Sequence, residues 1–206
     1  KLHYRAVTDD VGLDQQHIPM HIKDGLGMLH LSIRKHFPDG ISDMKPNGII
    51  AAAGPGESAY TQYDRNITKY TCEWLARAAA EPTDKPWALF VSFVTPHFPL
   101  TAPEEFYALY PPEDMPPVKC DPRGGFEPHP WHRSYLAKTG AEHYDDRQHQ
   151  VAAAAYLGLC SFMDAQVGLV VDALNANGFG ESTDILYTSD HGENAGARGM
   201  WGKSNH

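Results

Sequence analysis

The sequence predicts an α/β fold, because two helical patterns are each followed by a short apolar run with the length of a strand. The first pattern covers residues 63–80 and precedes the run 87–94, and the second covers 151–174 and precedes the run 184–187. Near-continuous apolar runs of this kind are typical of parallel strands covered on both faces. We therefore expect a mainly parallel sheet flanked by helices.

Residues 1–60 give a weaker signal, because several glycines interrupt their apolar patterns. The stretch Met20–Arg34 has the best helical pattern there, and we expect one helix in it. The glycine-containing stretch Pro46–Tyr60 is typical of a surface loop.

The first helix–strand unit begins with an amphipathic helix over Tyr63–Ala80. Asp64 lies near its start, where the helix dipole favours a negative charge. The turn residues Glu81–Pro86 end the helix, and Trp87–Val94 follows as a buried strand that Thr95–Pro99 breaks. The apolar stripe of the helix consists of Ile67, Tyr70, Thr71, Trp74, Leu75 and Ala78.

The second unit follows an irregular excursion over residues 111–143, which seven prolines within 111–130 predict. The pair Asp145–Asp146 is a suitable N-cap region for a long helix that Asn177–Gly178 ends. Asp184–Tyr187 is then the second buried strand. The apolar stripe of the long helix consists of Val151, Ala155, Leu159, Phe162, Met163, Val167, Val170 and Leu174.

The composition is that of an ordinary globular chain with one domain. The 206 residues, 42% hydrophobic and 21% charged, suffice to bury a core. A net charge of −9 argues against sequence-independent binding to nucleic acid or to an anionic membrane. No apolar run approaches the roughly 20 residues of a transmembrane helix. Three widely spaced cysteines predict reduced thiols, which favour the cytoplasm while leaving the compartment open.

The most informative stretch is Ile185–Glu193, where an apolar segment ends in Ser-Asp-His-Gly. Asp190 and His191 carry side chains that bind divalent metals, although an isolated Asp-His pair after a strand is more often a capped turn. His97 follows the other predicted strand, and the carboxyl ends of parallel strands share one edge of a sheet. We therefore expect His97 on the same edge as Asp190 and His191.

Two ammonium groups and a further imidazole complete the candidate set. Lys203 follows the metal pair after a short loop, and Lys1 and His3 would project the same way from an extended segment. Together these side chains suit the binding of a tetrahedral oxyanion through metal, lysine and histidine. Four histidines near the excursion are expected to be solvated polar residues, with substrate recognition as the alternative. They are His129, His132, His143 and His149.

Four short blocks resemble the motifs of sulfatases, in the same order along the chain. Lys1–Tyr4 resembles the Gly-Lys-x-His block of that family without its Gly, and Thr95–Pro99 resembles its Pro-His-x-Pro turn. Ser189–Gly192 resembles the late metal-binding block, and Gly202–Lys203 the Gly-Lys that follows it. The resemblance spans essentially the whole chain and is nearest to choline-sulfatase-like enzymes and phosphonate monoester hydrolases. It implies an alkaline-phosphatase-like fold.

The resemblance implies a role for each matched residue. Asp190 and His191 would bind a divalent metal, for which Ca²⁺ is the family expectation, while an imidazole ligand also suits Mn²⁺, Zn²⁺ or Fe²⁺. The residues that it makes catalytic are Lys1, His3, His97 and Lys203. The first two of these would hold the formylglycine hydrate that attacks sulfur or phosphorus. The last two would contact the transferred group and its bridging oxygen as negative charge grows there.

One segment that sulfatases require has no match in this chain. They carry Cys-x-Pro-x-Arg or Ser-x-Pro-x-Arg, whose first residue becomes formylglycine, and an early acidic metal pair. Cys120–Gly124 comes nearest, but its Arg is one position early and it follows His97, whereas the family order places the segment before Lys1. The same order rejects Asp9–Asp10 as the acidic pair. We therefore expect residues 1–206 to form a single incomplete sulfatase-like domain without the nucleophile segment and a C-terminal part.

The resemblance thus implies a metal-dependent sulfuric ester hydrolase that acts on small sulfate monoesters, with its formylglycine outside this chain. One alternative is a hydrolase of phosphonate or phosphate mono- or diesters with the same machinery, and another is a non-catalytic binding protein with the sulfatase fold. We expect no nucleic-acid or membrane partner, and a homo-oligomer stays open. A polypeptide of this length alone is expected to have no turnover.

Overall fold

The computed structural model describes residues 8–18, 20, 22–23, 26–27, 48–139 and 143–203, which belong to two units, Lys1–Lys45 and Pro46–His206. In the first unit, β1 (Ile22–Lys23) and β2 (Leu26–Gly27) pair antiparallel as a short hairpin. The helix expected there is wrong at these positions. Asp-Gly lies between the two strands in the sequence, and this dipeptide strongly favours a two-residue hairpin turn.

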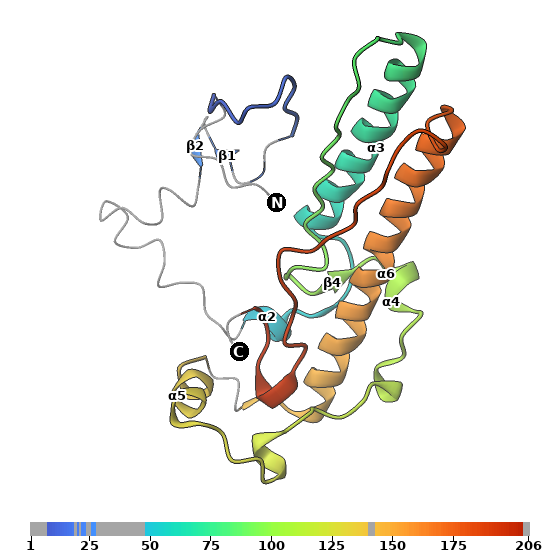
Figure 1. The fold of residues 1–206 in the computed structure, drawn as a ribbon. Coiled ribbons are helices and arrows are strands. Elements are labelled where there is room, and N and C mark those ends of the chain that lie inside the picture. The colour runs from blue at the N-terminus through green and yellow to red at the C-terminus, as the bar shows by residue number, and fades with distance from the viewer. Residues whose placement is uncertain are drawn as a thin grey trace. The chain divides into compact units, whose positions relative to one another are not determined.

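Two long helices, α3 (Ala59–Ala80) and α6 (Asp146–Ala176), lie side by side in the second unit (Figure 1). Both begin with a capping box, in which the side chain of Ser58 or Asp145 accepts the N–H of the third helical residue and receives a reciprocal bond. The two expected helices and the N-cap at Asp145 are therefore confirmed. Helix α3 starts before the expected residue because the cap at Ser58 precedes its apolar stripe.

The core of this unit forms along one face of α6. Leu159 and Phe162 have no exposed surface, and Ala155 is equally buried. Strand β4 (Thr101–Ala102) crosses this face at Gly158, where a Cβ atom would lie 3.0 Å from the Cβ of Ala102. A glycine at this position therefore lets the strand approach the helix closely.

The only sheet that the described residues of this unit form is a parallel pair, in which β3 (Gly54–Pro55) aligns with β4. A short helix, α2 (Gly48–Ala51), precedes β3, and Ile50 is only 3% exposed. The surface loop expected over Pro46–Tyr60 is therefore wrong in part. The adjacent apolar side chains of Ile49 and Ile50 pack into the core beside α6, which removes them from water.

Neither expected buried strand is present in the described residues. Trp87–Val94 and Asp184–Tyr187 contain no strand. The apolar side chains of the second segment are exposed, with Leu186 at 90%, and those of the first range from Phe90 at 62% to the buried Val94 at 6%. A strand exists only where another strand accepts and donates its backbone hydrogen bonds, and no described segment pairs with these two. The apolar composition of these two segments is typical of strands inside a sheet, but a strand also needs a neighbouring strand, which composition cannot predict.

The excursion is more regular than its prolines predict. It follows α4 (Glu104–Tyr107) and contains the 3₁₀ turns η1 (Pro112–Asp114) and η2 (Pro122–Gly124). The helix α5 (Pro130–Thr139) then corrects the expectation of an irregular segment. Its first residue is proline, which has no N–H to leave unpaired and whose fixed φ suits the first position of a helix.

Helix α6 is long and apolar enough, by length and composition, to cross a membrane, and no other helix in the described part of the chain is. The central helix of a globular core meets the same criterion. Here its buried Gln166 accepts a hydrogen bond from Thr68 of α3 at 2.8 Å, and Phe162 is fully covered. We therefore describe α6 as the core helix of this unit.

Candidate functional site

The first site residue, His97, lies in a tight turn that follows the extended segment 87–94. Cis peptide bonds precede Pro96 and Pro99, and the N–H of His97 donates to the carbonyl of Val94 at 3.1 Å. The ring Nδ1 lies 2.7 Å from the carbonyl oxygen of Phe98. Since a carbonyl oxygen can only accept, Nδ1 carries a proton there, and in the neutral ring Nε2 is the basic nitrogen.

The second block, Asp190–His191, ends the other extended segment. Nδ1 of His191 lies 2.9 Å from the carbonyl oxygen of Gly192, which again makes Nε2 the basic nitrogen of the neutral ring. That Nε2 lies 3.4 Å from Oδ2 of Asp190. A carboxylate oxygen and an imidazole nitrogen that face each other in this way attract a proton or a metal cation between them.

The structure brings the two blocks together. The ring centroids of His97 and His191 lie 6.4 Å apart, and the ring of Tyr60 from the first turn of α3 lies 5.9 Å from that of His97. The turn after residue 94 and the turn after residue 189 therefore share one location, although neither preceding segment is a strand. The roles of the two histidines stay predictions.

Lys203 follows a closed loop that starts directly after Asp190–His191. The carboxylate of Glu193 accepts the N–H groups of Gly202 and Ala195, the latter at 3.2 Å. Asn194 donates to the carbonyl of Gly202 from its backbone at 3.3 Å and from its side chain at 2.5 Å. Gly202 is thus held against Glu193 and Asn194, and the exposed Lys203 is the residue that follows it.

Glu193 and Asn194 were missing from the sequence prediction. The local pattern does contain a signal, since a carboxylate and an amide directly follow the metal block and both side chains readily bind backbone groups of a turn. The 3₁₀ turn η4 (Ala197–Gly199) forms the far end of the loop that they close.

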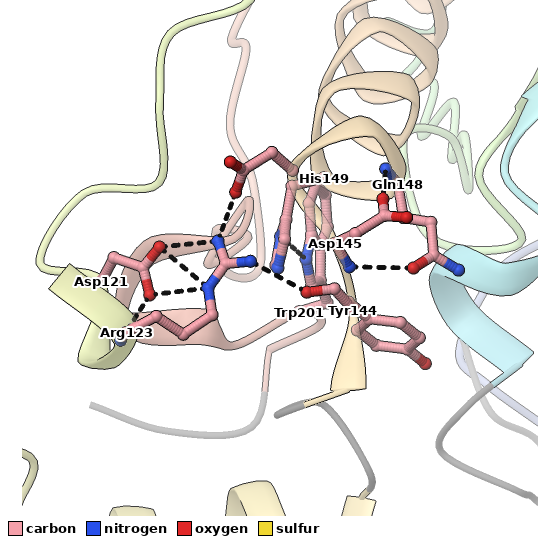
Figure 2. A network of polar contacts seen from close by, with 8 residues as sticks. Asp121, Arg123, Tyr144, Asp145, Gln148, His149 and Trp201 are labelled. Carbon is pink, nitrogen blue, oxygen red and sulfur yellow. Dashed lines mark hydrogen bonds and ion pairs between the residues drawn. The ribbon is translucent and has the colours of Figure 1, made fainter.

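A polar network fixes this loop to α6 (Figure 2). The guanidinium of Arg123 in η2 bonds to both oxygens of Asp121, to the carboxylate of Asp146 at 2.7 Å and to the carbonyl of Tyr144 at 3.0 Å. The hydrogen bond from Arg123 lowers the pKa of Asp121. The network therefore attaches η2 to the beginning of α6 through charge-assisted bonds.

His149 continues the attachment from the first turn of α6. It is 6% exposed, and its Nδ1 accepts a hydrogen bond from the indole Nε1 of Trp201 at 3.1 Å. Burial, and after it the charge of Arg123, lowers the pKa of His149. The neutral ring thus binds Trp201, two residues before Lys203 (Figure 2).

The expectation that four histidines near the excursion are solvated is wrong for two of them. His149 is buried against Trp201, and His132 is only 9% exposed. His132 lies in α5, which was not expected, and His149 lies in the first turn of α6, before the apolar stripe from which that helix was predicted. His129 and His143 are exposed.

The two rejected motifs have other structural roles. Asp121, within the segment Cys120–Gly124, caps η2 by accepting the N–H of Arg123 at 2.8 Å. Asp10 accepts the N–H of Gly12 at 2.8 Å in an exposed turn. Lys1 and His3 lie outside the described residues, so their positions stay predictions.

The metal question depends on the donor atoms that the described residues offer. No group of three or more His, Cys, Asp or Glu side chains that could hold a metal occurs among them. Asp190 and His191 supply two ligand atoms 3.4 Å apart, a separation compatible with one cation bound at about 2.0–2.6 Å from each. The donor set therefore fits part of a metal site.

A family model described as sulfatase matches residues 36–206 of the chain. The chain belongs to the sulfatase family. This sulfatase-family chain is 31% identical to the choline-sulfatase of Rhizobium meliloti over 77% of its own length and 32% of that protein. It is also 28% identical to a sulfatase of Formosa agariphila, over 87% of its length and 41% of that protein.

Solved structures confirm the α/β class. The phosphonate monoester hydrolase of Agrobacterium radiobacter superimposes with a TM-score of 0.59 at 25% identity, over 77% of this chain and 33% of that one. The corresponding enzyme of Silicibacter pomeroyi gives a TM-score of 0.52 at 22% identity, over 87% and 38%. The sulfatase-family resemblance and the alkaline-phosphatase-like fold class are therefore both confirmed. The chain spans 32% and 41% of the lengths of the two relatives named above.

Proposed function

We propose that this chain forms part of a metal-dependent hydrolase of sulfate monoesters. One observation carries the proposal: the rings of His97 and His191 lie 6.4 Å apart, so two motifs that are far apart in the sequence share one location. The loop that carries the exposed Lys203 starts directly after His191 in the sequence, and Glu193 closes it through the N–H of Gly202. Membership of the sulfatase family supports this chemistry.

Asp190 and His191 would hold the cation, through Oδ2 and Nε2, and Ca²⁺ is the ion that we propose. When bound, the cation supplies positive charge that stabilises the anionic oxygens of the ester. Nε2 of His97 is the ring nitrogen that can carry a proton toward the departing oxygen, since Nδ1 is engaged with the carbonyl of Phe98. The ammonium of Lys203 would add positive charge where the bridging oxygen becomes negative.

The proposal also includes two residues near the start of the chain that lie outside the described residues. Lys1 and His3 would hold the nucleophile, which we expect to be a formylglycine supplied from outside this chain. Their polar side chains suit the binding and polarisation of a hydrate hydroxyl. The substrate would be a small-molecule ester rather than nucleic acid.

A phosphonate or phosphate ester is the second candidate substrate. The structural neighbours are phosphonate monoester hydrolases, and this observation favours it. Sulfate and phosphonate esters both present a tetrahedral centre with anionic oxygens, so a metal, an imidazole and an ammonium group bind either one.

The test is an assay of the gene product that contains residues 1–206 together with the sequence that flanks them. With calcium present, we expect its kcat/KM for an aryl sulfate to exceed that for an aryl phosphonate monoester by at least about tenfold, or 1.4 kcal/mol of transition-state stabilisation. A preference for the phosphonate would replace the first candidate with the second. Activity on neither ester would contradict both.

A further inference from the structure

Asp64 of α3 is a fully buried carboxylate, with no exposed surface. Both of its carboxylate oxygens accept hydrogen bonds from Val94 and Thr95, which lie 30 and 31 positions further along the chain. The N–H of Val94 donates to Oδ1 at 2.9 Å, and the N–H of Thr95 donates to Oδ2 at 2.9 Å. The hydroxyl of Thr95 donates to Oδ2 at 2.6 Å.

The donors lie immediately before His97. The carbonyl of Val94 accepts the N–H of His97 at 3.1 Å, while the N–H of Val94 is bound to Asp64. Val94 is therefore held from both sides of its backbone. The chain of bonds runs from α3 through Val94 and Thr95 to the turn that carries the imidazole.

Burial raises the pKa of Asp64, while the three donors act in the opposite direction. A buried carboxylate is costly unless its oxygens are hydrogen-bonded, and an aliphatic or amide side chain would avoid that cost. The carboxylate suits this position because it is the side chain that can accept three bonds at two oxygens. The helix that carries it is itself fixed, since Thr68 donates to Gln166 of α6 at 2.8 Å.

We propose that Asp64 is a positioning residue that holds the turn at Val94–Thr95 and thereby orients His97 toward His191. The inference rests on the proposed function, because it assigns the purpose of the clamp to the catalytic imidazole. The clamp consists of Asp64, Val94 and Thr95. A purely structural buried aspartate would stabilise the fold without governing the position of the His97 ring.

Four variants of the full 206-residue chain separate these two roles. Asp64→Asn replaces one acceptor oxygen with an NH₂ group, and Thr95→Val removes only the hydroxyl donor at nearly constant volume. Thr95→Ser keeps that hydroxyl and serves as the conservative variant. Thr68→Val is the control on the same helix. It removes the hydroxyl that contacts Gln166 at 2.8 Å and the backbone carbonyl of Asp64 at 3.1 Å, and it leaves the Asp64 carboxylate and its three donors in place.

The first readout is nuclear magnetic resonance of the backbone amides of Val94 and Thr95 and of the His97 ring. We expect Asp64→Asn and Thr95→Val to speed hydrogen exchange at these amides by at least about tenfold and to shift or broaden the His97 ring signals. Thr95→Ser and Thr68→Val should leave those signals in place. Unchanged His97 signals in Thr95→Val would overturn the proposed clamp. This variant keeps the Asp64 carboxylate, so the test stands even where Asp64→Asn fails to fold. Equal changes in Thr68→Val would also overturn the clamp.

The second readout is the response of His97 to inorganic sulfate in the presence of calcium. The wild-type ring signals should move on sulfate addition, and the response should be weaker in Thr95→Val than in Thr95→Ser. A wild-type ring that ignores sulfate contradicts the proposed function. The first readout would still support the clamp in that case, so the two failures are distinguishable.

Discussion

The partner of each imidazole decides which ring nitrogen takes part in chemistry. Nδ1 of both His97 and His191 lies next to a carbonyl oxygen, so the proton resides there and Nε2 is basic. His149 has the opposite arrangement, since its Nδ1 accepts the indole N–H of Trp201. In their neutral forms, the two rings at the candidate site and the ring of His149 are therefore different tautomers.

Acid should destabilise the chain through His149. Burial lowers the pKa of its ring below the value of about 6.5 that holds in the unfolded chain. The neutral ring therefore contributes stability above that unfolded value, and the contribution is lost as the pH falls through the lower folded pKa. Protonation would also place a proton on Nδ1 opposite the Trp201 donor. Urea unfolding at a series of pH values below about 6.5 should show the free energy of unfolding falling as the pH falls.

The control for this prediction is a second histidine. His149→Gln removes the titrating group, so its loss of stability toward acid pH should be smaller than in the wild type. His129 is exposed, and His129→Gln should keep the wild-type pH dependence. Identical pH profiles for wild type and His149→Gln would show that another group is responsible.

Calcium binding should depend on the carboxylate of Asp190. If the cation lies between Oδ2 of Asp190 and Nε2 of His191, calcium should raise the melting temperature of the wild type, because it binds only the folded state. Asp190→Asn should abolish this increase. Asp184 offers an exposed carboxylate on the same segment, so Asp184→Asn should retain the increase and controls for lost net charge. A calcium effect that survives Asp190→Asn would remove this residue from the metal site.

At the scale of elements, the two long helices could be predicted and the strands could not. The stripes of α3 and α6 are local patterns, and a helix satisfies its own backbone hydrogen bonds. Phe90 and Leu186 belong to runs with strand-like composition, but a strand needs partners that lie elsewhere. The hairpin β1–β2 was missed because the weak helical pattern obscured the Asp-Gly turn signal.

The candidate site shows the same limit. His97 and Asp190–His191 could be found from the sequence, because each follows an apolar run and matches a family motif. Asp64 was interpreted as a charge at a helix start, whereas it is buried and bonded to Thr95. Nothing in a local pattern connects positions so far apart. Glu193 was overlooked because its partner, Gly202, lies across a loop.

The contact between α6 and β4 can be tested with two glycines of the same helix. A Cβ at Gly158 would lie 3.0 Å from the Cβ of Ala102 and 3.2 Å from the carbonyl oxygen of Phe106. Gly158→Ala should therefore cost about 1–3 kcal/mol of unfolding free energy. Gly168 has no neighbouring atom within 4 Å of such a Cβ, and Gly168→Ala should add about 0.5–1 kcal/mol. Chemical denaturation distinguishes them, and equal effects would contradict the close approach of β4.

For the molecule as a whole, the exposed apolar segments are the main departure from an ordinary globular surface. Ile185, Leu186 and Tyr187 are 62%, 90% and 66% exposed, so they contribute little burial to this chain. Leu186→Asp should therefore change its unfolding free energy by no more than about 0.5 kcal/mol. Leu159 has no exposed surface, and Leu159→Ala should cost about 2–5 kcal/mol. A large loss in Leu186→Asp would show that this segment is covered in solution.

Catalysis should require more than these 206 residues. The described residues bring His97 close to His191 and its neighbour Asp190, but no described segment matches the sulfatase nucleophile motif. The chemical step needs a nucleophile, and the sulfatase nucleophile motif has no match in this sequence. The purified chain should therefore show no turnover of an aryl sulfate, with or without calcium. A polypeptide that joins residues 1–206 to a sulfatase nucleophile segment should be active under the same conditions. Turnover that co-elutes with the 206-residue chain and disappears in His97→Ala would contradict this expectation and place a nucleophile within the chain. Turnover that His97→Ala leaves unchanged would identify a contaminating enzyme.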